Sequence, residues 1–237
     1  MRTAQLPLLV ALPLASLAGC TWNTVEDGRL GRLQMTPSAC GQAGCNLGDG
    51  IAVGGALDLT LRGKTGVDAS DLHLVSSAPW IVEVLSTEAT GSEPRFRIVG
   101  DGAGLADLIA VDRYGYQVDY LPVEVATIAG FDIGATADGM TESTVPGLGE
   151  VFEVAAGTDV HLEVDGTSRG RALTGDVQLL VELDAALAAA MLPGSDPARG
   201  QLHFKAPLGT HDLTITAPGG ARELVRVVGA GPLQPTR

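Results

Sequence analysis

The sequence predicts an all-β protein made of two similar β-sandwiches in tandem, preceded by a cleaved leader. Three observations support this prediction. Short runs such as "ALDLTL" (56–61) alternate apolar and polar residues, which is typical of strands with one buried face. Glycine (32 residues) and proline (13 residues) fall mainly between such runs, where turns are expected. The same order of runs then occurs again about a hundred residues later, which indicates a repeated domain.

The chain begins with a segment that has the features of a secretory signal. Met1-Arg2 is followed by an apolar stretch from Leu6 to Ala18. This stretch is too short to span a bilayer, since a spanning helix needs about 20 apolar residues. It ends in Leu17-Ala18-Gly19-Cys20, which resembles the lipobox of bacterial lipoproteins. The resemblance implies a signal peptide over residues 1–19 and lipidation of Cys20; the alternative is an ordinary cleaved leader with an incidental cysteine.

The lipobox resemblance also implies where the protein is held. Cysteines of this kind carry a diacylglycerol and usually an amide-linked acyl chain such as palmitate, and two or more chains anchor a protein stably. Residue 21 is Thr and not Asp, which favours the outer membrane of a Gram-negative bacterium over retention at the inner membrane. We expect a cell-envelope protein in which residues 20–28 form a lipid-anchored linker.

The charge balance is strongly acidic. Removal of residues 1–19 leaves 218 residues with 14 basic and 28 acidic side chains. Because this charge repels phosphate backbones, nucleic acid is not expected as a partner. A chain of this length is expected to form one or two domains.

The cysteines other than Cys20 are Cys40 and Cys45, in "CGQAGC". An isolated pair in an exported chain usually oxidises, so we expect a disulfide worth about 2 kcal/mol for so small a ring. The alternative is a metal or redox pair, but no further cysteine is free to complete a metal site.

The two copies of the repeat correspond run by run. Residues 54–61, 93–99, 104–112 and 119–126 match residues 156–164, 199–206, 209–217 and 222–229, and the boundary falls near residues 127–130. Each copy has, in the same order, a glycine that opens a strand of three apolar–polar pairs, a strand centred on Phe, and a closing Val-x-Val. This order resembles the bacterial immunoglobulin-like domains of exported and surface proteins. The resemblance implies immunoglobulin-like β-sandwiches over residues 29–127 and 128–230, and we expect a disordered tail over 231–237.

The alternation also predicts which side chains fill the two interiors, since alternate residues of both sheets share one core in a sandwich. The predicted core residues are Leu57, Leu59, Trp80, Val82, Phe96, Ile98, Leu108 and Val123 in the first domain, and Val160, Leu162, Val164, Leu179, Phe204, Leu213, Ile215 and Val227 in the second. For Trp80 the alternative is a contact residue. Residues 184–192 are either a short helix capped by Asp184 or a strand.

Catalytic patterns are not legible, so we do not expect an enzyme or a cofactor. Gly-x-Ser-x-Gly does not occur, and "GDGAG" (100–104) lacks the Lys-Ser/Thr of a phosphate loop. His211 and Asp212 are adjacent on a predicted strand and therefore point to opposite faces, which prevents them from acting as a base and its carboxylate.

Two sets of residues are candidates for metal binding. Asp68, Asp71, Asp101 and Asp112 are either turn residues or calcium ligands, but they lack an Asp-x-Asp-x-Asp spacing. His161 and His203 lie at polar positions of strands expected to pair, so they are either outward neighbours able to hold zinc or two solvated histidines.

Three tyrosines, Tyr114, Tyr116 and Tyr120, cluster in "RYGYQVDY". Residues 112–115 are expected to form a hairpin turn with Tyr114 exposed at its tip. The tyrosines are candidates for ligand contact, and the alternative is that they cap the sandwich.

These observations favour a lipid-anchored, non-enzymatic envelope protein that acts as a structural or interaction module. Its expected partners are the membrane, through the lipid, and an envelope protein or glycan. The alternatives are a lipoprotein that binds a glycan or metal, and an accessory subunit of an envelope enzyme. A substrate-binding transport lipoprotein would require a longer α/β chain, which the strand pattern contradicts.

Overall fold

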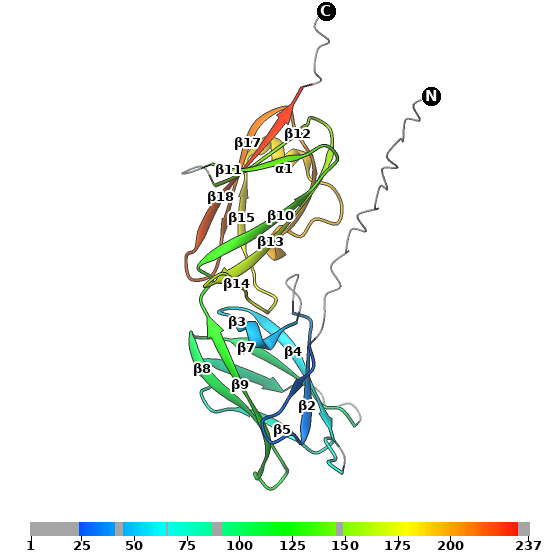
Figure 1. Ribbon diagram of the computed structural model, residues 1–237, viewed down its shortest axis with the longest axis vertical. Coiled ribbons are helices and arrows are strands. Elements are labelled where there is room, and N and C mark those ends of the chain that lie inside the picture. The colour runs from blue at the N-terminus through cyan, green and yellow to red at the C-terminus, as the bar shows by residue number, and fades with distance from the viewer. Residues whose placement is uncertain (1–23, 41–44, 65, 87–91, 146–148, 232–237) are drawn as a thin grey trace, which may run out of the picture.

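The computed structural model describes residues 24–40, 45–64, 66–86, 92–145 and 149–231. The predicted signal peptide, the predicted lipidation site Cys20 and most of the predicted tail lie outside these residues. The described chain forms two β-sandwiches, one after the other along the long axis of the molecule (Figure 1).

The first sandwich contains nine strands in two sheets. One sheet has the order β1-β2-β4-β7-β6 and the other β3-β9-β8-β5. All strand pairs are antiparallel except β3 with β9. The strands are β1 (Glu26–Asp27), β2 (Leu33–Ser38), β3 (Ile51–Ala52), β4 (Ala56–Gly63), β5 (His73–Ser76), β6 (Val82–Ser86), β7 (Arg95–Gly100), β8 (Gly104–Val111) and β9 (Gln117–Ala126).

The second sandwich also contains nine strands in two sheets. One sheet has the order β10-β13-β14, with β16 on the other edge of β13, and the second has the order β11-β12-β18-β17-β15. Its strands are β10 (Gly130–Thr136), β11 (Thr141–Val145), β12 (Gly149–Ala155), β13 (Asp159–Ser168), β14 (Arg171–Ala172), β15 (Leu180–Leu183), β16 (Gln201–Lys205), β17 (Gly209–Thr216) and β18 (Arg222–Ala230). Two 3₁₀ turns, at Leu47–Asp49 and Pro197–Arg199, complete the described secondary structure with helix α1.

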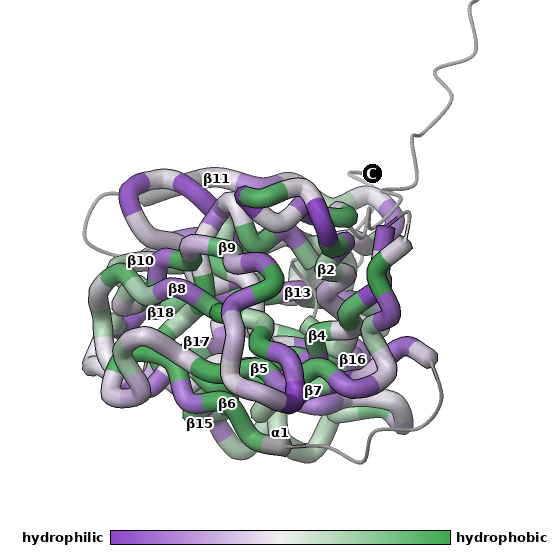
Figure 2. Tube along the Cα trace, turned by 90° about the horizontal axis from the view of Figure 1, so that it is seen from below, coloured by the Kyte–Doolittle hydropathy of each residue, from purple (hydrophilic) through white to green (hydrophobic). Residues whose placement is uncertain are grey.

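The predicted all-β fold of two tandem sandwiches is confirmed. The runs matched in sequence become equivalent strands, because β4 pairs with β7 as β13 pairs with β16, and β8 pairs with β9 as β17 pairs with β18. Each sandwich encloses its own hydrophobic cluster. Seen from below, short hydrophobic and hydrophilic segments succeed one another along the chain (Figure 2), as expected for strands with one buried face.

The core prediction is correct for every residue named above except Trp80. The other predicted core residues are less than one-tenth exposed, whereas the side chain of Trp80 is 71% exposed. The sequence analysis placed Trp80 on a strand in phase with Val82. The strand β6 begins only at Val82, and Trp80 lies in the preceding turn, which is closed by the Ile81 N–H donating to the Ala78 carbonyl.

The ambiguous segment 184–192 contains a helix, α1 (Ala185–Ala190). Asp184 is its N-cap, and its Oδ1 atom accepts a hydrogen bond from the Leu187 N–H at 2.8 Å. Within the described part of the chain, no helix is long and apolar enough to cross a membrane.

The two sandwiches are joined by backbone hydrogen bonds between segments more than a hundred residues apart. The Thr174 carbonyl accepts from the Ala52 N–H at 2.9 Å, and the Thr174 N–H donates to the Gly50 carbonyl at 2.8 Å. Asp176 and Ala56 exchange two further backbone bonds, at 2.7 and 3.2 Å. The loop before β15 therefore adds to the edge of the first sandwich as a short strand would.

Side chains reinforce this junction. Glu124 on β9 of the first sandwich forms ion pairs with Arg169 and Arg171 of the second, each at 3.4 Å. Glu124 is about one-third exposed, so each pair contributes only a fraction of a kcal/mol, up to about 1 kcal/mol. The backbone bonds are the stronger constraint, and together these contacts hold the two sandwiches as one body.

Candidate functional sites

The predicted disulfide is present, with a Cys40–Cys45 S–S distance of 2.05 Å. Both cysteines are buried, and the backbone carbonyl of each accepts hydrogen bonds from another segment. The Cys40 carbonyl accepts from the Gly175 N–H of the second sandwich at 3.0 Å. The Cys45 carbonyl accepts from both the N–H and the hydroxyl of Thr24, at 3.1 and 2.9 Å. The disulfide ring thus links the start of the described chain to the domain junction.

Residues 24–27 fall in the stretch that the sequence analysis assigned to a linker, but they belong to the first sandwich. Besides the Thr24 bonds, β1 pairs with β2 in antiparallel register, Glu26 opposite Met35 and Asp27 opposite Gln34. This finding shortens the free part of any tether that precedes Thr24.

A buried carboxylate that the sequence analysis missed lies next to this N-terminal segment. Asp119 on β9 is fully buried, and it accepts hydrogen bonds from the N–H groups of Leu30, Arg32, Leu33 and Tyr120 at 2.8–2.9 Å. Burial acts to raise the pKa of Asp119, but the four N–H donors outweigh this effect and hold the pKa below its usual range. The carboxylate therefore fixes the loop between β1 and β2.

The signal for this carboxylate was present in the sequence. Asp119 is in phase with the buried Leu121 and Val123, so it is a charge at an inward position of a strand. Gly28 provides the space, since a Cβ atom there would come within 2.3 Å of the carboxylate carbon.

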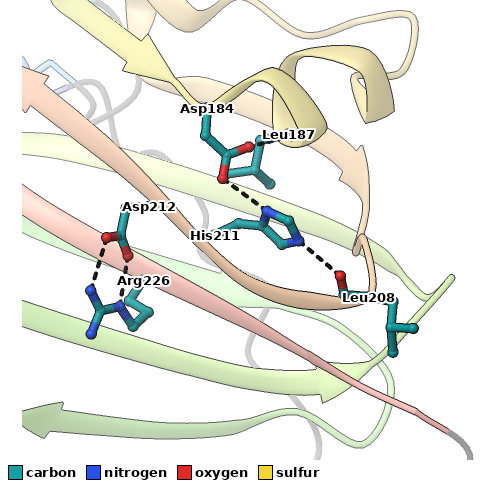
Figure 3. A network of polar contacts seen from close by, with 6 residues as sticks. All are labelled: Asp184, Leu187, Leu208, His211, Asp212 and Arg226. Atoms are coloured by element: carbon teal, nitrogen blue, oxygen red, sulfur yellow. Dashed lines mark hydrogen bonds and ion pairs between the residues drawn. The ribbon is translucent and has the colours of Figure 1, made fainter.

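The adjacent residues His211 and Asp212 have separate partners, as expected for neighbours on a strand (Figure 3). Asp212 binds Arg226 through two hydrogen bonds, at 2.7 and 2.8 Å. His211 lies between Asp184, 2.8 Å from Nδ1, and the Leu208 carbonyl, 3.1 Å from Nε2. The sequence analysis identified Asp184 only as a helix cap, and its pairing with His211 was missed.

The His211 geometry resembles the base and orienting carboxylate of a hydrolase, but both ring nitrogens face acceptors. Both contacts are satisfied together only when the ring is protonated, because both nitrogens then donate. The Leu208 carbonyl, followed by the Asp184 carboxylate, accordingly raises the pKa of His211. An imidazolium with both protons engaged cannot act as a general base, and we assign this network to joining α1 to β17.

His161 and His203 are directly opposite each other on the paired strands β13 and β16. Their rings are stacked, with centroids 3.8 Å apart and an interplanar angle of 14°. The Nε2 atom of His203 is buried without a hydrogen-bond partner. Among the described residues, no group of three or more His, Cys, Asp or Glu side chains is close enough to bind one metal ion.

The acidic calcium candidates act in turns. Asp68 accepts from the Ser70 N–H at 2.9 Å, and Asp112 accepts from the N–H groups of both Tyr114 and Tyr116. The Asp71 Oδ2 atom lies 3.7 Å from the Arg113 Nη1 atom, whereas Asp101 is exposed in the connection between β7 and β8. These contacts favour the turn interpretation.

The Asp112 turn presents two of the three candidate tyrosines to solvent. Tyr114 is 70% exposed and Tyr116 is 72% exposed, whereas Tyr120 is half-buried. The Arg113 guanidinium lies over the Tyr114 ring, 4.9 Å from its centroid. This hairpin between β8 and β9 is at the end of the first sandwich that is remote from the second (Figure 1).

A cavity at the junction is lined by Ala52, Ile128, Asp165 and Asp176, among others, but it encloses only about 30 Å³. Burial, together with Glu163 and the facing Asp132, raises the pKa of Asp165 to about 6. The cavity is too small for a substrate.

Comparison with known proteins gives structural similarity only. No protein-family model matches the chain, and no curated protein is detectably similar in sequence. Among solved structures, it is similar to fibronectin(III)-like modules of CbhA from Clostridium thermocellum, at 17% identity over 79% of this chain and 92% of that chain (TM-score 0.26). It is also similar to the Yersinia pseudotuberculosis adhesin InvE, at 16% identity over 85% of this chain and 61% of that chain (TM-score 0.30).

A third similar structure is SGBP-B of the Bacteroides ovatus mixed-linkage glucan utilization locus, in complex with a mixed-linkage heptasaccharide. The identity is 11% over 78% of this chain and 45% of that chain, with a TM-score of 0.32. TM-scores this low support no inference about function, and the fold is assigned from the strand pairing of the chain itself.

Proposed function

We propose that this protein is a lipid-anchored, non-enzymatic module of the bacterial cell envelope that presents an interaction surface on one two-sandwich body. The observation that carries the proposal is the junction. Backbone bonds from Thr174 and Asp176 fix the second sandwich on the first, as suits a scaffold or spacer that must hold a defined shape.

The anchor is proposed from the sequence. Leu17-Ala18-Gly19-Cys20 follows a short apolar stretch, so the mature protein begins at a lipidated Cys20 and is held at the outer membrane. The Cys40–Cys45 disulfide is consistent with an oxidising compartment outside the cytoplasm.

The non-enzymatic part of the proposal is supported by the candidate sites. The His211 imidazole has both nitrogens bound to acceptors, and the junction cavity measures only about 30 Å³. Neither site offers a nucleophile, a free base and space for a substrate together.

The test is chemical crosslinking in intact cells, followed by affinity purification of the full-length protein from the membrane fraction. We expect an envelope protein or glycan to be captured, and we expect the control variant Cys20→Ser to lose both the membrane fractionation and the captured partner. Recovery of the wild-type protein in the soluble fraction would contradict the anchor. Turnover of a substrate by the purified protein would contradict the non-enzymatic assignment.

A glycan is the second candidate partner, because Tyr114 and Tyr116 are exposed together at one hairpin tip beside Arg113. Aromatic faces with a nearby cation are suited to stacking on a sugar ring and to binding its hydroxyl groups. The variant Tyr114→Ala should abolish binding on a glycan array, while Tyr120→Phe, which keeps the half-buried ring, should retain it. Equal binding by both variants would refute this candidate.

A further inference from the structure

We propose that the anchored protein lies lengthwise along the membrane, with its long axis within about 30° of the membrane plane. The inference rests on the proposed lipidation of Cys20, and it goes further because it assigns an orientation to the body. The orientation follows from the place where the tether joins the body and from two lengths.

The tether joins the middle of the molecule and not one end. Thr24, the first described residue, is bound through its N–H and its hydroxyl to the Cys45 carbonyl. The neighbouring Asn46 N–H donates to the Thr174 hydroxyl of the second sandwich, at 3.1 Å. The Cys40 carbonyl of the same disulfide ring accepts from Gly175. The chain therefore leaves the body at the domain junction.

The tether is short. Four residue steps separate Cys20 from Thr24. A fully extended chain rises at most about 3.6 Å per residue, so Thr24 lies within about 14 Å of the lipidated cysteine, whatever the conformation of the residues between.

Each sandwich is longer than the tether. Strand β9 has ten residues and runs from the Tyr116 hairpin to Ala126, whose carbonyl accepts from Val53 near the junction. Strand β13 also has ten residues, and its Ser168 end is at the junction, beside Arg169. At about 3.3 Å per residue, each sandwich extends about 30 Å away from the junction, in opposite directions (Figure 1).

An upright molecule is incompatible with these lengths. With its long axis along the membrane normal, one sandwich would reach about 30 Å toward the bilayer from a junction held within about 14 Å, so its end would enter the lipid by about 16 Å. The surface of these sandwiches carries charged residues that are costly to bury in hydrocarbon. The ratio of the two lengths limits the long axis to about 30° from the membrane plane.

The orientation keeps both ends of the molecule, including the exposed Tyr114 and Tyr116, within about 30 Å of the membrane surface. The protein is acidic, with 14 basic and 28 acidic side chains after residue 19, so charge does not draw it to anionic lipid. The orientation is imposed by the tether, and we expect it on zwitterionic vesicles and at high salt.

The test is energy transfer from the protein to headgroup-labelled phosphatidylcholine vesicles that carry the lipidated protein, purified from membranes. Cys20 is consumed by the lipid and Cys40–Cys45 by the disulfide, so one added cysteine provides a unique labelling site. We choose Tyr114→Cys at the remote end of the first sandwich and Ala155→Cys, exposed at the remote end of the second.

We expect both labels to transfer to the lipid well above background, since a tilt below about 30° keeps both ends within about 30 Å of the surface. The matched control inserts 20 Gly/Ser residues between Cys20 and Thr24, which adds a tether of about 25 Å and should lower both efficiencies. Strong transfer from one label with background transfer from the other would overturn the proposal, as would equal transfer with and without the insert. Flotation with the vesicles is scored separately, and its failure would refute the lipid anchor instead.

Discussion

The buried carboxylate of Asp119 allows the sharpest test of the packing around the N-terminal segment. We predict that Asp119→Ala destabilises the first sandwich by about 3–5 kcal/mol. The variant leaves four backbone N–H groups without their acceptor, and each hydrogen bond to a charged group is worth about 1.5–3 kcal/mol. We discount the sum because the N–H groups of Leu30 and Arg32 belong to exposed residues that water can reach, whereas Leu33 is fully buried.

The assay combines urea unfolding, followed by circular dichroism, with hydrogen exchange of the loop amides. Asp119→Asn keeps the shape of the side chain but loses the charge and one acceptor oxygen, so its free energy of unfolding should lie between those of wild type and Asp119→Ala. Asp101→Ala is the control, because this carboxylate is exposed and, within the described chain, makes no hydrogen bond or ion pair. The amides of Leu30, Arg32 and Leu33 should lose protection in Asp119→Ala alone.

The pH dependence gives the sign of the effect. Because the pKa of Asp119 is lowered in the folded protein, its stabilisation is present above the unfolded pKa of about 3.9 and is lost as the pH falls through the folded pKa. Wild type and Asp119→Ala should therefore converge below that range. An unfolding midpoint for Asp119→Ala equal to that of Asp101→Ala at pH 7, with the loop amides still protected, would refute the reasoning.

Three further predictions concern other sites. Asp165→Asn removes a carboxyl group whose pKa is raised to about 6. Its free energy of unfolding, measured in urea, should exceed that of wild type by about 2 kcal/mol at pH 8, and this difference should shrink as the pH falls from 6 to 4. An equal free energy of unfolding at pH 8 would contradict this prediction. His211→Gln should lower the free energy of unfolding by about 1–2 kcal/mol at pH 5.5 and by less at pH 9, as measured by thermal unfolding. The reason is that the pKa of His211 is raised in the folded protein, so its stabilisation is present below the unfolded pKa of about 6.5 and is lost above the folded pKa. The same loss of stability at both pH values would argue against the imidazolium. Replacing Cys40 and Cys45 together by Ser should cost about 2 kcal/mol and speed hydrogen exchange of the Gly175 amide, and unchanged exchange would separate the disulfide from the junction.

The sequence was sufficient for the strands and for most of the core, because an alternation such as that of Leu57 and Leu59 is a local pattern that burial imposes directly. It failed at Trp80, since the alternation continued by chance into a turn and gave no sign that the strand begins two residues later. The exposed Tyr114 was predicted correctly because Asp and Gly at fixed offsets specify the turn.

The polar contacts between distant residues could not be predicted. Asp184 lies 27 residues from His211, and Thr174 lies 128 residues from Asn46, so their pairing depends on strand order and not on any local spacing. The domain junction could not be predicted either, since its hydrogen bonds are made by backbone groups that are present in every residue. A sequence pattern marks which residues are buried, but it does not mark which loop meets which edge.

The lipid anchor can be tested by the intact mass of the protein purified from bacterial membranes, with fragmentation of its N-terminal peptide. The account predicts a chain that begins at Cys20, with the mass of a diacylglyceryl group and an amide-linked acyl chain on that residue and a mass decrease of two hydrogens for the Cys40–Cys45 bond. A chain that retains Met1, or one that is cleaved elsewhere with an unmodified Cys20, would contradict it.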